Sequence, residues 1–218
     1  MRREWSRRVE AEYGSAAIAQ HLTLWLIQIG ASPDLIRTGL RIVDDELVHA
    51  GECHQVVVAC GAGAIMLDRD RLALQRHPGE PLEHDVLRAC LSVFCLGETV
   101  AVPLFRALRD GCSVPLARRV LTRVLRDEVR HREFGWTLLE WLVALPLGAA
   151  LITLAERELP AMLASVRDSY APAHSEPCSG PERAWGLMPG ASYREVFERT
   201  VEREYVPRFA RLQIRCAG

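Results

Sequence analysis

The segments DELVH (residues 45–49) and DEVRH (residues 127–131) carry aspartate, glutamate and histidine in the same order and at the same spacing. Both lie within sequences whose apolar residues recur every three or four positions, which is the period of an amphipathic helix. Glutamate and histidine three residues apart project from one helix face, with Cβ atoms about 5–6 Å apart. Each segment therefore predicts a helix that offers a carboxylate and an imidazole side by side.

Helical periodicity dominates the rest of the chain, and strand patterns are nearly absent. Glycine and proline positions divide the sequence into four long expected helices, at residues 4–28, 33 to about 61, 82–110 and 115–145. Two shorter C-terminal helices are expected at residues 149–168 and 192–213, and a Pro/Ser/Gly-rich loop at residues 171–190 lies between them. Short links between long helices favour antiparallel packing. We therefore expect an all-α fold, an antiparallel four-helix bundle (residues 1–146) with a C-terminal helical extension (residues 147–218) packed on it in the same domain.

The two motif segments interrupt the apolar stripes that should face the core of this bundle. The first and third long helices each add one acid at an inward position of their own stripe. The four helices together direct six polar side chains to one point in the middle of the bundle: Glu12, Glu46, His49, Glu98, Glu128 and His131.

Four buried carboxylates without partners would be very unfavourable, because like charges repel and lose hydration in a low-dielectric interior. Two divalent cations would balance the four negative charges, so the inventory predicts two metal ions. Oxygen-rich ligation with one histidine per ion suits iron or manganese, although zinc remains an alternative.

The aspartates that precede each Glu-x-x-His pair have a different expected role. We expect Asp127 to accept a hydrogen bond from the outer ring nitrogen of His49, and Asp45 to accept one from that of His131. Such bonds fix the tautomer and the orientation of an imidazole ligand.

With these motifs the chain resembles the ferritin-like di-iron carboxylate superfamily, and more closely a bacterial group of ferritin-like domain proteins that mostly lack an assigned activity. The matching stretches are EYGSAAIA (12–19), DELVHAGEC (45–53), CLGET (95–99) and DEVRH. The resemblance covers about residues 10–145. It implies a centre of two iron ions that reacts with O₂, and it implies that the six inward residues are both its metal ligands and its catalytic residues.

Three further positions are candidates for lining a pocket at this centre. Cys53 lies one turn from His49, Cys95 lies one turn from Glu98, and Ala16 lies on the stripe of Glu12. The alternative is that these residues are ordinary core. Pro103 removes a backbone donor from the third helix, which predicts either a simple kink or a local opening near Glu98.

Composition excludes several classes of partner. The net charge is −1 and the 27 basic residues, all arginine, do not cluster, so no nucleic-acid partner is expected. The seven cysteines show no paired spacing, which favours reduced thiols in a cytoplasmic protein. No stretch of about 18 apolar residues was recognised, so no membrane span is expected.

The expected function is that of a non-haem di-iron oxygenase or oxidase, which would hydroxylate, desaturate or N-oxygenate a small organic substrate with O₂ and an external electron donor, as a monomer or homodimer. One alternative is a ferroxidase or another iron-handling protein. A second is a non-catalytic helical module stabilised by metal. The simplest contrary interpretation is a bundle in which Arg106 or Arg123 neutralises the buried glutamates.

Overall fold

The computed structural model describes the whole chain except residues 62, 64, 69–71, 172–177 and 217–218. Every regular element in the described residues is helical, which confirms the all-α prediction. In chain order the elements are α1 (Arg2–Gln28), α2 (Pro33–Ala59), α3 (Leu82–Ala89), the π-helix η2 (Cys90–Glu98), α4 (Thr99–Gly111), α5 (Pro115–Val143), α6 (Gly148–Tyr170), α7 (Gly180–Ala184), α8 (Gly190–Thr200), the π-helix η3 (Val201–Tyr205) and α9 (Val206–Arg211).

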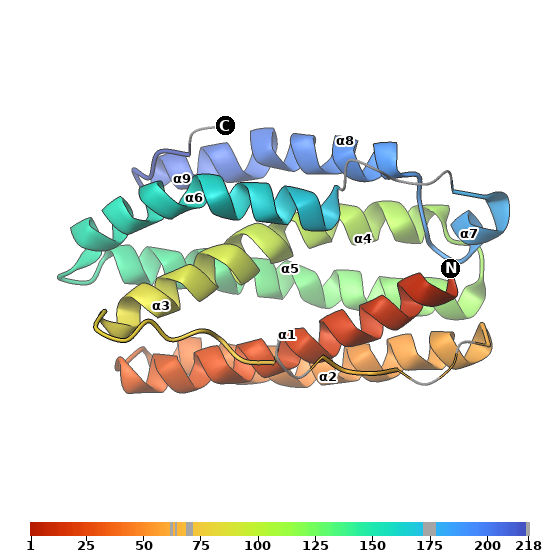
Figure 1. The fold of residues 1–218 in the computed structure, drawn as a ribbon, viewed down its shortest axis with the longest axis horizontal. Helices are drawn as coiled ribbons and strands as arrows, with labels where there is room; N and C mark the ends of the chain where they lie inside the picture. The colour runs from red at the N-terminus through yellow and green to blue at the C-terminus, as the bar shows by residue number, and fades with distance from the viewer. Residues whose placement is uncertain (62, 64, 69–71, 172–177, 217–218) are drawn as a thin grey trace.

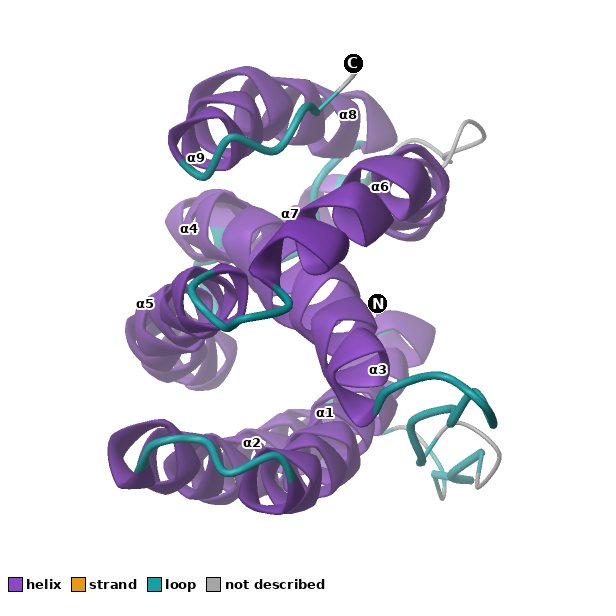
Figure 2. Cartoon of the chain, turned by 90° about the vertical axis from the view of Figure 1, so that its left-hand side faces the viewer, coloured by secondary structure: helices purple, strands orange, loops and turns teal. Residues whose placement is uncertain are grey.

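The helices lie in three layers (Figures 1 and 2). α1 and α2 form one outer layer, α5 and the rod made of α3, η2 and α4 form the middle layer, and α6 with α8 and α9 form the other outer layer. The link between α1 and α2 turns at Gly30, whose φ of 71° favours glycine. Ser32 then caps α2 by accepting a hydrogen bond from the backbone N–H of Leu35 (3.4 Å).

The third predicted helix is a continuous rod whose middle is π-helical. The π-helical stretch ends at Glu98, so the rod departs from regular α-helical bonding beside the residue where a local opening was expected, on the N-terminal side of Pro103. Side chains from other elements support this stretch. The Tyr205 hydroxyl donates to the carbonyl of Leu96 (2.6 Å), and the indole N–H of Trp136 donates to the Thr99 hydroxyl (2.9 Å).

By length and composition alone, the rod Leu82–Gly111 is apolar enough to cross a membrane. No membrane span is expected from the sequence; the rod qualifies by its mean hydropathy, although polar residues interrupt its apolar run. In the folded chain, 72% of the most apolar window is buried against other parts of the protein. The buried core helix of a soluble protein meets the same criterion.

The C-terminal part of the chain differs in detail from the prediction. The loop expected at residues 171–190 contains α7, which begins at a capping box formed by Ser179 and Glu182, while residues 172–177 lie outside the described part. The helix expected at 192–213 is three consecutive helical segments, α8, η3 and α9. Phe197, Tyr205 and Phe209 from these segments belong to the main apolar cluster, so the extension shares a core with the rest of the chain.

Replacing Gly135 with alanine is expected to reduce the free energy of unfolding by about 1–3 kcal/mol, because α5 and η2 touch there. A Cβ atom at this position would lie 2.6 Å from Cβ and 2.7 Å from the carbonyl carbon of Phe94. Gly14→Ala in α1 is the control, since it meets open space and should raise stability by about 0.5–1 kcal/mol. Urea unfolding compares them, and a Gly135→Ala protein as stable as the parent would contradict this contact.

Candidate metal centre

The polar residues singled out in the sequence lie between two apolar clusters that fill the interior. The first cluster contains Ile42 of α2 and Phe134 of α5. The second cluster contains Cys53 of α2 and Val124 of α5. Both Glu-x-x-His motifs fall in the interval between these residues. The centre is therefore closed by dry core at both ends of the helices, and charged groups within it interact strongly.

The structure brings all six predicted ligands together and buries them. Their donor atoms form two groups, within each of which all atoms lie within 4.8 Å of one another: Glu12, Glu46, His49 and Glu128 in the first, and Glu46, Glu98, Glu128 and His131 in the second. Glu46 and Glu128 belong to both groups. Each group offers donors for one ion, and the two shared carboxylates can bridge between neighbouring ions.

The inner ring nitrogens point into these groups without a hydrogen-bond partner. Nδ1 of His49 lies 3.4 Å from Oε2 of Glu12 and 3.6 Å from Oε2 of Glu46. Nδ1 of His131 lies 3.1 Å from Oε1 of Glu46 and 3.4 Å from Oε2 of Glu128. Both Nδ1 atoms, Oε2 of Glu46 and Oε2 of Glu128 are buried and unsatisfied. Such atoms each cost about 1–3 kcal/mol, and one cation in each group would satisfy all four.

The outer ring nitrogens are held by the two aspartates. Nε2 of His49 lies 3.2 Å from Oδ2 of Asp127, and Nε2 of His131 lies 3.3 Å from Oδ2 of Asp45. These are the pairings anticipated from the sequence. A proton on Nε2 leaves the Nδ1 lone pair free, so the arrangement selects the tautomer that presents Nδ1 to a metal.

Arginines at the surface bind the outward sides of these aspartates. Arg130 donates to both Asp45 (2.8 Å) and Asp127 (2.9 Å), and Arg126 donates twice to Asp127 (2.9 and 3.0 Å). Burial opposes ionisation of Asp127, but hydrogen bonds from Arg126, His49 and Arg130 outweigh it and lower its pKa. Asp127 is therefore a permanent acceptor for the imidazole of His49. The role of Arg130 in holding both aspartates was not predicted from the sequence, although Arg130 lies only two positions after Glu128.

Replacing Asp45 with alanine is expected to weaken metal binding about 10–100-fold without changing the number of ions bound, because the imidazole of His131 loses its orienting partner. Asp44→Ala is the control, since its exposed side chain lies next in sequence but outside this network. Competition with a chelator measures both affinities. Equal affinities for the two variants would exclude the orienting role.

Burial and mutual repulsion shift the pKa values of the inner carboxyl groups in the metal-free protein. Burial raises the pKa of Glu46. Burial and, next, the charge of Glu128 raise the pKa of Glu98 well above its ordinary value. The metal-free cluster is thus a strained set of acids that a divalent cation would relieve.

The imidazoles respond to the same acids in the opposite sense. Burial favours neutral His49, but the adjacent Glu12 and Glu46 carboxylates outweigh it and raise its pKa to about 11. Burial also opposes the charge on His131, yet Asp45 and Glu128 raise its pKa. Both imidazoles therefore hold protons in the metal-free protein, and a metal must displace them to bind.

No arginine neutralises the inner glutamates among the residues that the structure describes. Arg123 instead pairs with Glu52 (3.3 Å) and lies 3.9 Å from Asp127, and no ion pair joins Arg106 to the cluster. The described residues therefore do not form the buried Arg–Glu pairs of the alternative interpretation.

Comparisons of the chain with protein-family models, with curated proteins and with solved structures found no significant match. What the centre can do therefore rests on its own geometry. Its buried carboxylates and imidazoles could hold a metal ion, and they agree with the pattern of a ferritin-like di-iron site.

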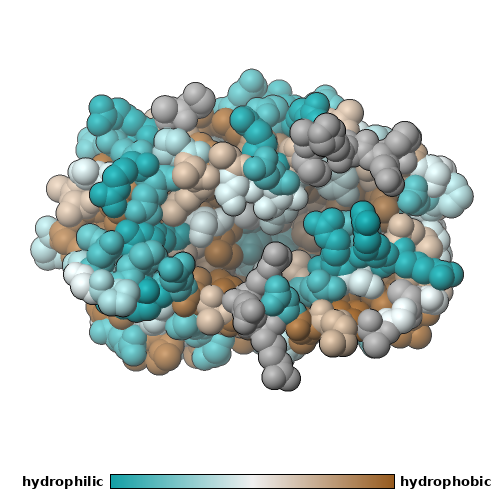
Figure 3. Space-filling view, in the orientation of Figure 1, coloured by the Kyte–Doolittle hydropathy of each residue, from teal (hydrophilic) through white to brown (hydrophobic). Residues whose placement is uncertain are grey.

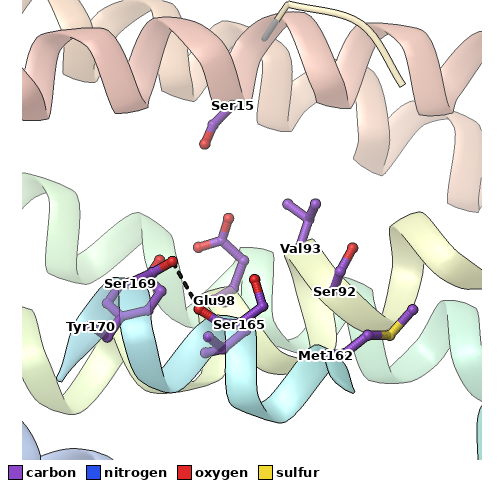
Figure 4. A pocket seen from close by; sticks show the side chains of 10 residues that line it. Ser15, Ser92, Val93, Glu98, Met162, Ser165, Ser169 and Tyr170 are labelled. Carbon is purple, nitrogen blue, oxygen red and sulfur yellow. Dashed lines mark hydrogen bonds between the residues drawn. The ribbon is translucent and has the colours of Figure 1, made fainter. Parts of the chain in front are cut away.

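A cavity of about 320 Å³ lies beside Glu98, and the molecular surface is hollowed near the middle of the face on which α6 lies (Figure 3). Its walls come from α1, η2 and α6: Ser15, Ser92, Val93, Gly97, Glu98, Met162, Ser165, Val166, Ser169 and Tyr170. Figure 4 shows Ser15 projecting from α1 across the gap from Glu98.

The predicted pocket residues Cys53, Cys95 and Ala16 do not line this cavity. Cys53 packs into the second apolar cluster, and the Cys95 thiol lies 3.8 Å from that of Cys90 in the core. Ala16 is buried as well. A step of one turn along a helix leads from the ligands into the apolar clusters, whereas the cavity opens sideways toward α6.

Among the lining residues, Tyr170 carries a phenolic hydroxyl that could take part in chemistry, and no sequence motif predicts this role. It ends α6, far from the recognised helices in sequence. Burial and the charge of Glu98 raise the pKa of Tyr170, so its hydroxyl stays protonated and can donate a hydrogen bond.

Proposed function

We propose that this chain is a non-haem di-iron oxidoreductase that uses O₂ to oxidise a small organic molecule. One observation carries the proposal: two buried donor groups share Glu46 and Glu128, and their inward nitrogen and oxygen atoms lack partners. No hydrogen bond between side chains in the described part of the chain satisfies these atoms. Two cations would do so and would also balance the four carboxylates.

The proposed architecture is a ferritin-like four-helix bundle made of α1, α2, α5 and the rod of η2 and α4. Support comes from the origin of the ligands, because each of these four helical rods contributes to the cluster. Glu12 comes from α1 and Glu98 from the end of η2, while α2 and α5 each contribute a Glu-x-x-His pair.

Iron is the proposed metal, with manganese as the alternative. Each group offers three carboxylates and one imidazole, a hard, oxygen-rich donor set that suits these ions. Iron held by these residues would supply the electrons that activate O₂.

The chain's own residues would prepare that chemistry in three ways. Asp45 and Asp127 keep the Nε2 protons in place, so that each Nδ1 faces its ion. The two apolar clusters exclude water from both ends of the centre. The Tyr170 hydroxyl in the cavity wall is a proton-bearing donor next to the carboxylates. Electrons would come from an external donor.

Anaerobic loading with Fe²⁺, followed by exposure to O₂, tests the proposal. We expect two ions per chain, O₂ uptake that quickens with an oxidisable organic compound, and a monomer or homodimer by light scattering. Rapid Fe²⁺ oxidation in a large hollow assembly, indifferent to organic compounds, would favour a ferroxidase instead. A protein that binds no metal would be a helical module without redox chemistry.

A further inference from the structure

The cavity beside Glu98 has one wall that a four-helix bundle alone would not provide. Five of its lining residues belong to α6, which lies in the outer layer and follows the four ligand-bearing rods in sequence: Met162, Ser165, Val166, Ser169 and Tyr170. Its volume of about 320 Å³ lies at the lower end of the range of small-molecule pockets, which is about 300–1,000 Å³. The size admits a small molecule.

Among the residues that the structure describes, the lining contains no positively charged side chain, and Glu98 is its one carboxylate. An anionic compound would therefore find no cationic side chain to pair with. When two cations balance the carboxylates of the cluster, no net charge remains to attract a cationic compound either. The charge pattern favours an uncharged occupant.

Hydroxyl groups provide most of the polarity of the lining. Ser92 donates to the carbonyl of Arg88 (2.7 Å) and Ser169 donates to that of Ser165 (2.9 Å), which leaves the oxygen lone pairs of both hydroxyls facing the cavity as acceptors. Within the described residues, no hydrogen bond occupies the hydroxyl of Tyr170. The walls thus offer both donors and acceptors to a neutral polar group.

The two ends of the cavity differ in character (Figure 4). Val93 and Met162 lie toward one end, with Ser92 between them, while Ser169 and Tyr170 lie toward the other, and Glu98 lies between the two ends. An amphipathic molecule would place its apolar part against the first pair. Its polar group would then face the hydroxyls of Ser169 and Tyr170, with Glu98 beside it in the wall.

We infer that this cavity is the substrate site and that it takes a small, uncharged, amphipathic molecule with a hydroxyl-like group, held by the α6 hydroxyls beside Glu98. The inference rests on the proposed function, because a redox centre at Glu98 is what makes the occupant a substrate. It assigns to α6 the choice of substrate, while α1, α2, η2 and α5 hold the metals.

Binding of cyclohexanol and of cyclohexanecarboxylate, followed by ligand-observed NMR, tests the assignment in metal-free and in Mn²⁺-loaded protein. Cyclohexanol should bind in both states, and the carboxylate should bind at least tenfold more weakly. Ser165→Trp, at an exposed position of α6 that lines the cavity, should weaken cyclohexanol binding at least tenfold. Ala164→Trp, exposed on the same helix but outside the lining, is the matched control.

The metal content of both variants separates this inference from the proposed function. Unchanged metal content with lost cyclohexanol binding in Ser165→Trp alone supports the inference. Absence of cyclohexanol binding, equal binding of the carboxylate, or equal binding by both variants would overturn it, whatever the metal content. If cyclohexanol binds as expected but no metal does, the cavity is a binding site and the proposed redox function fails.

Discussion

Replacing Glu46 with alanine is expected to abolish binding of both metal ions, because this carboxylate belongs to both donor groups. Glu12→Gln should have a smaller effect and retain one ion, since Glu12 belongs to the His49 group alone; Glu98→Gln should do the same for the other group. Elemental analysis after anaerobic loading with Fe²⁺ and desalting gives the number of ions per chain.

Glu52→Gln provides the control for this series. Glu52 lies on the same helix as Glu46 but pairs with Arg123 outside the cluster, so its loss should leave the metal content unchanged. Circular dichroism verifies that each variant remains helical. Two ions per chain in Glu46→Ala would show that neither ion needs this carboxylate, which would contradict its proposed role as a ligand shared by both groups.

The second large effect concerns the free energy of unfolding, whose dependence on pH should change sign when metal binds. In the metal-free protein the pKa of His49 is raised to about 11 and that of His131 is also raised, against about 6.5 in an unfolded chain. Between pH 6.5 and 8 the unfolded chain loses these protons and the folded chain keeps them. The free energy of unfolding should therefore fall as pH rises, by up to about 1.4 kcal/mol per pH unit for each histidine.

The raised pKa values of Glu46 and Glu98 act in the same direction, because the folded chain also keeps these protons longer than the unfolded chain. Metal reverses the sign for the imidazoles. In the loaded protein each Nδ1 would bind an ion, so the unfolded state would hold more protons than the folded state below pH 6.5. The free energy of unfolding of the metal-loaded protein should therefore increase as pH rises from 5.5 to about 7.

Urea unfolding at pH 5.5, 6.5 and 7.5, with a chelator or with Mn²⁺, measures both slopes. His54→Ala is the control, because His54 is exposed on the same helix and lies outside the cluster. A metal-free protein whose stability rises between pH 6.5 and 7.5 would mean that its imidazoles are neutral, and metal binding would then release no protons from them.

Much of the fold could be predicted because its signals are local. The spacing of three between Glu46 and His49, and between Glu128 and His131, fixes a shared helix face whatever surrounds it. Helix ends followed from proline, serine and glycine positions, and the ends of α1, α2 and α6 lie within a few residues of those expected. The capping box at Ser179 was also readable in sequence, but the prolines and serines around it led to the prediction of a plain loop.

The irregular parts needed the folded chain. The π-helical stretch that ends at Glu98 is supported by Tyr205, which follows Leu96 by more than a hundred residues, and no local pattern announces such a partner. The cavity was misassigned for the same reason. Cys53 and Cys95 satisfy the rule of one helical turn, yet the open space lies where α6 approaches α1 and η2.

By itself, the sequence determined which six side chains face inward and which two aspartates stand behind the histidines, because helical phase is set by neighbours along the chain. Only the tertiary structure decided that Glu46 and Glu128 are shared, that Nδ1 faces inward, and that α6 forms a wall with Tyr170 at its end. These features depend on how far apart helices pack and on which side chains fill the space between them, and such distances are set by contacts across the whole core.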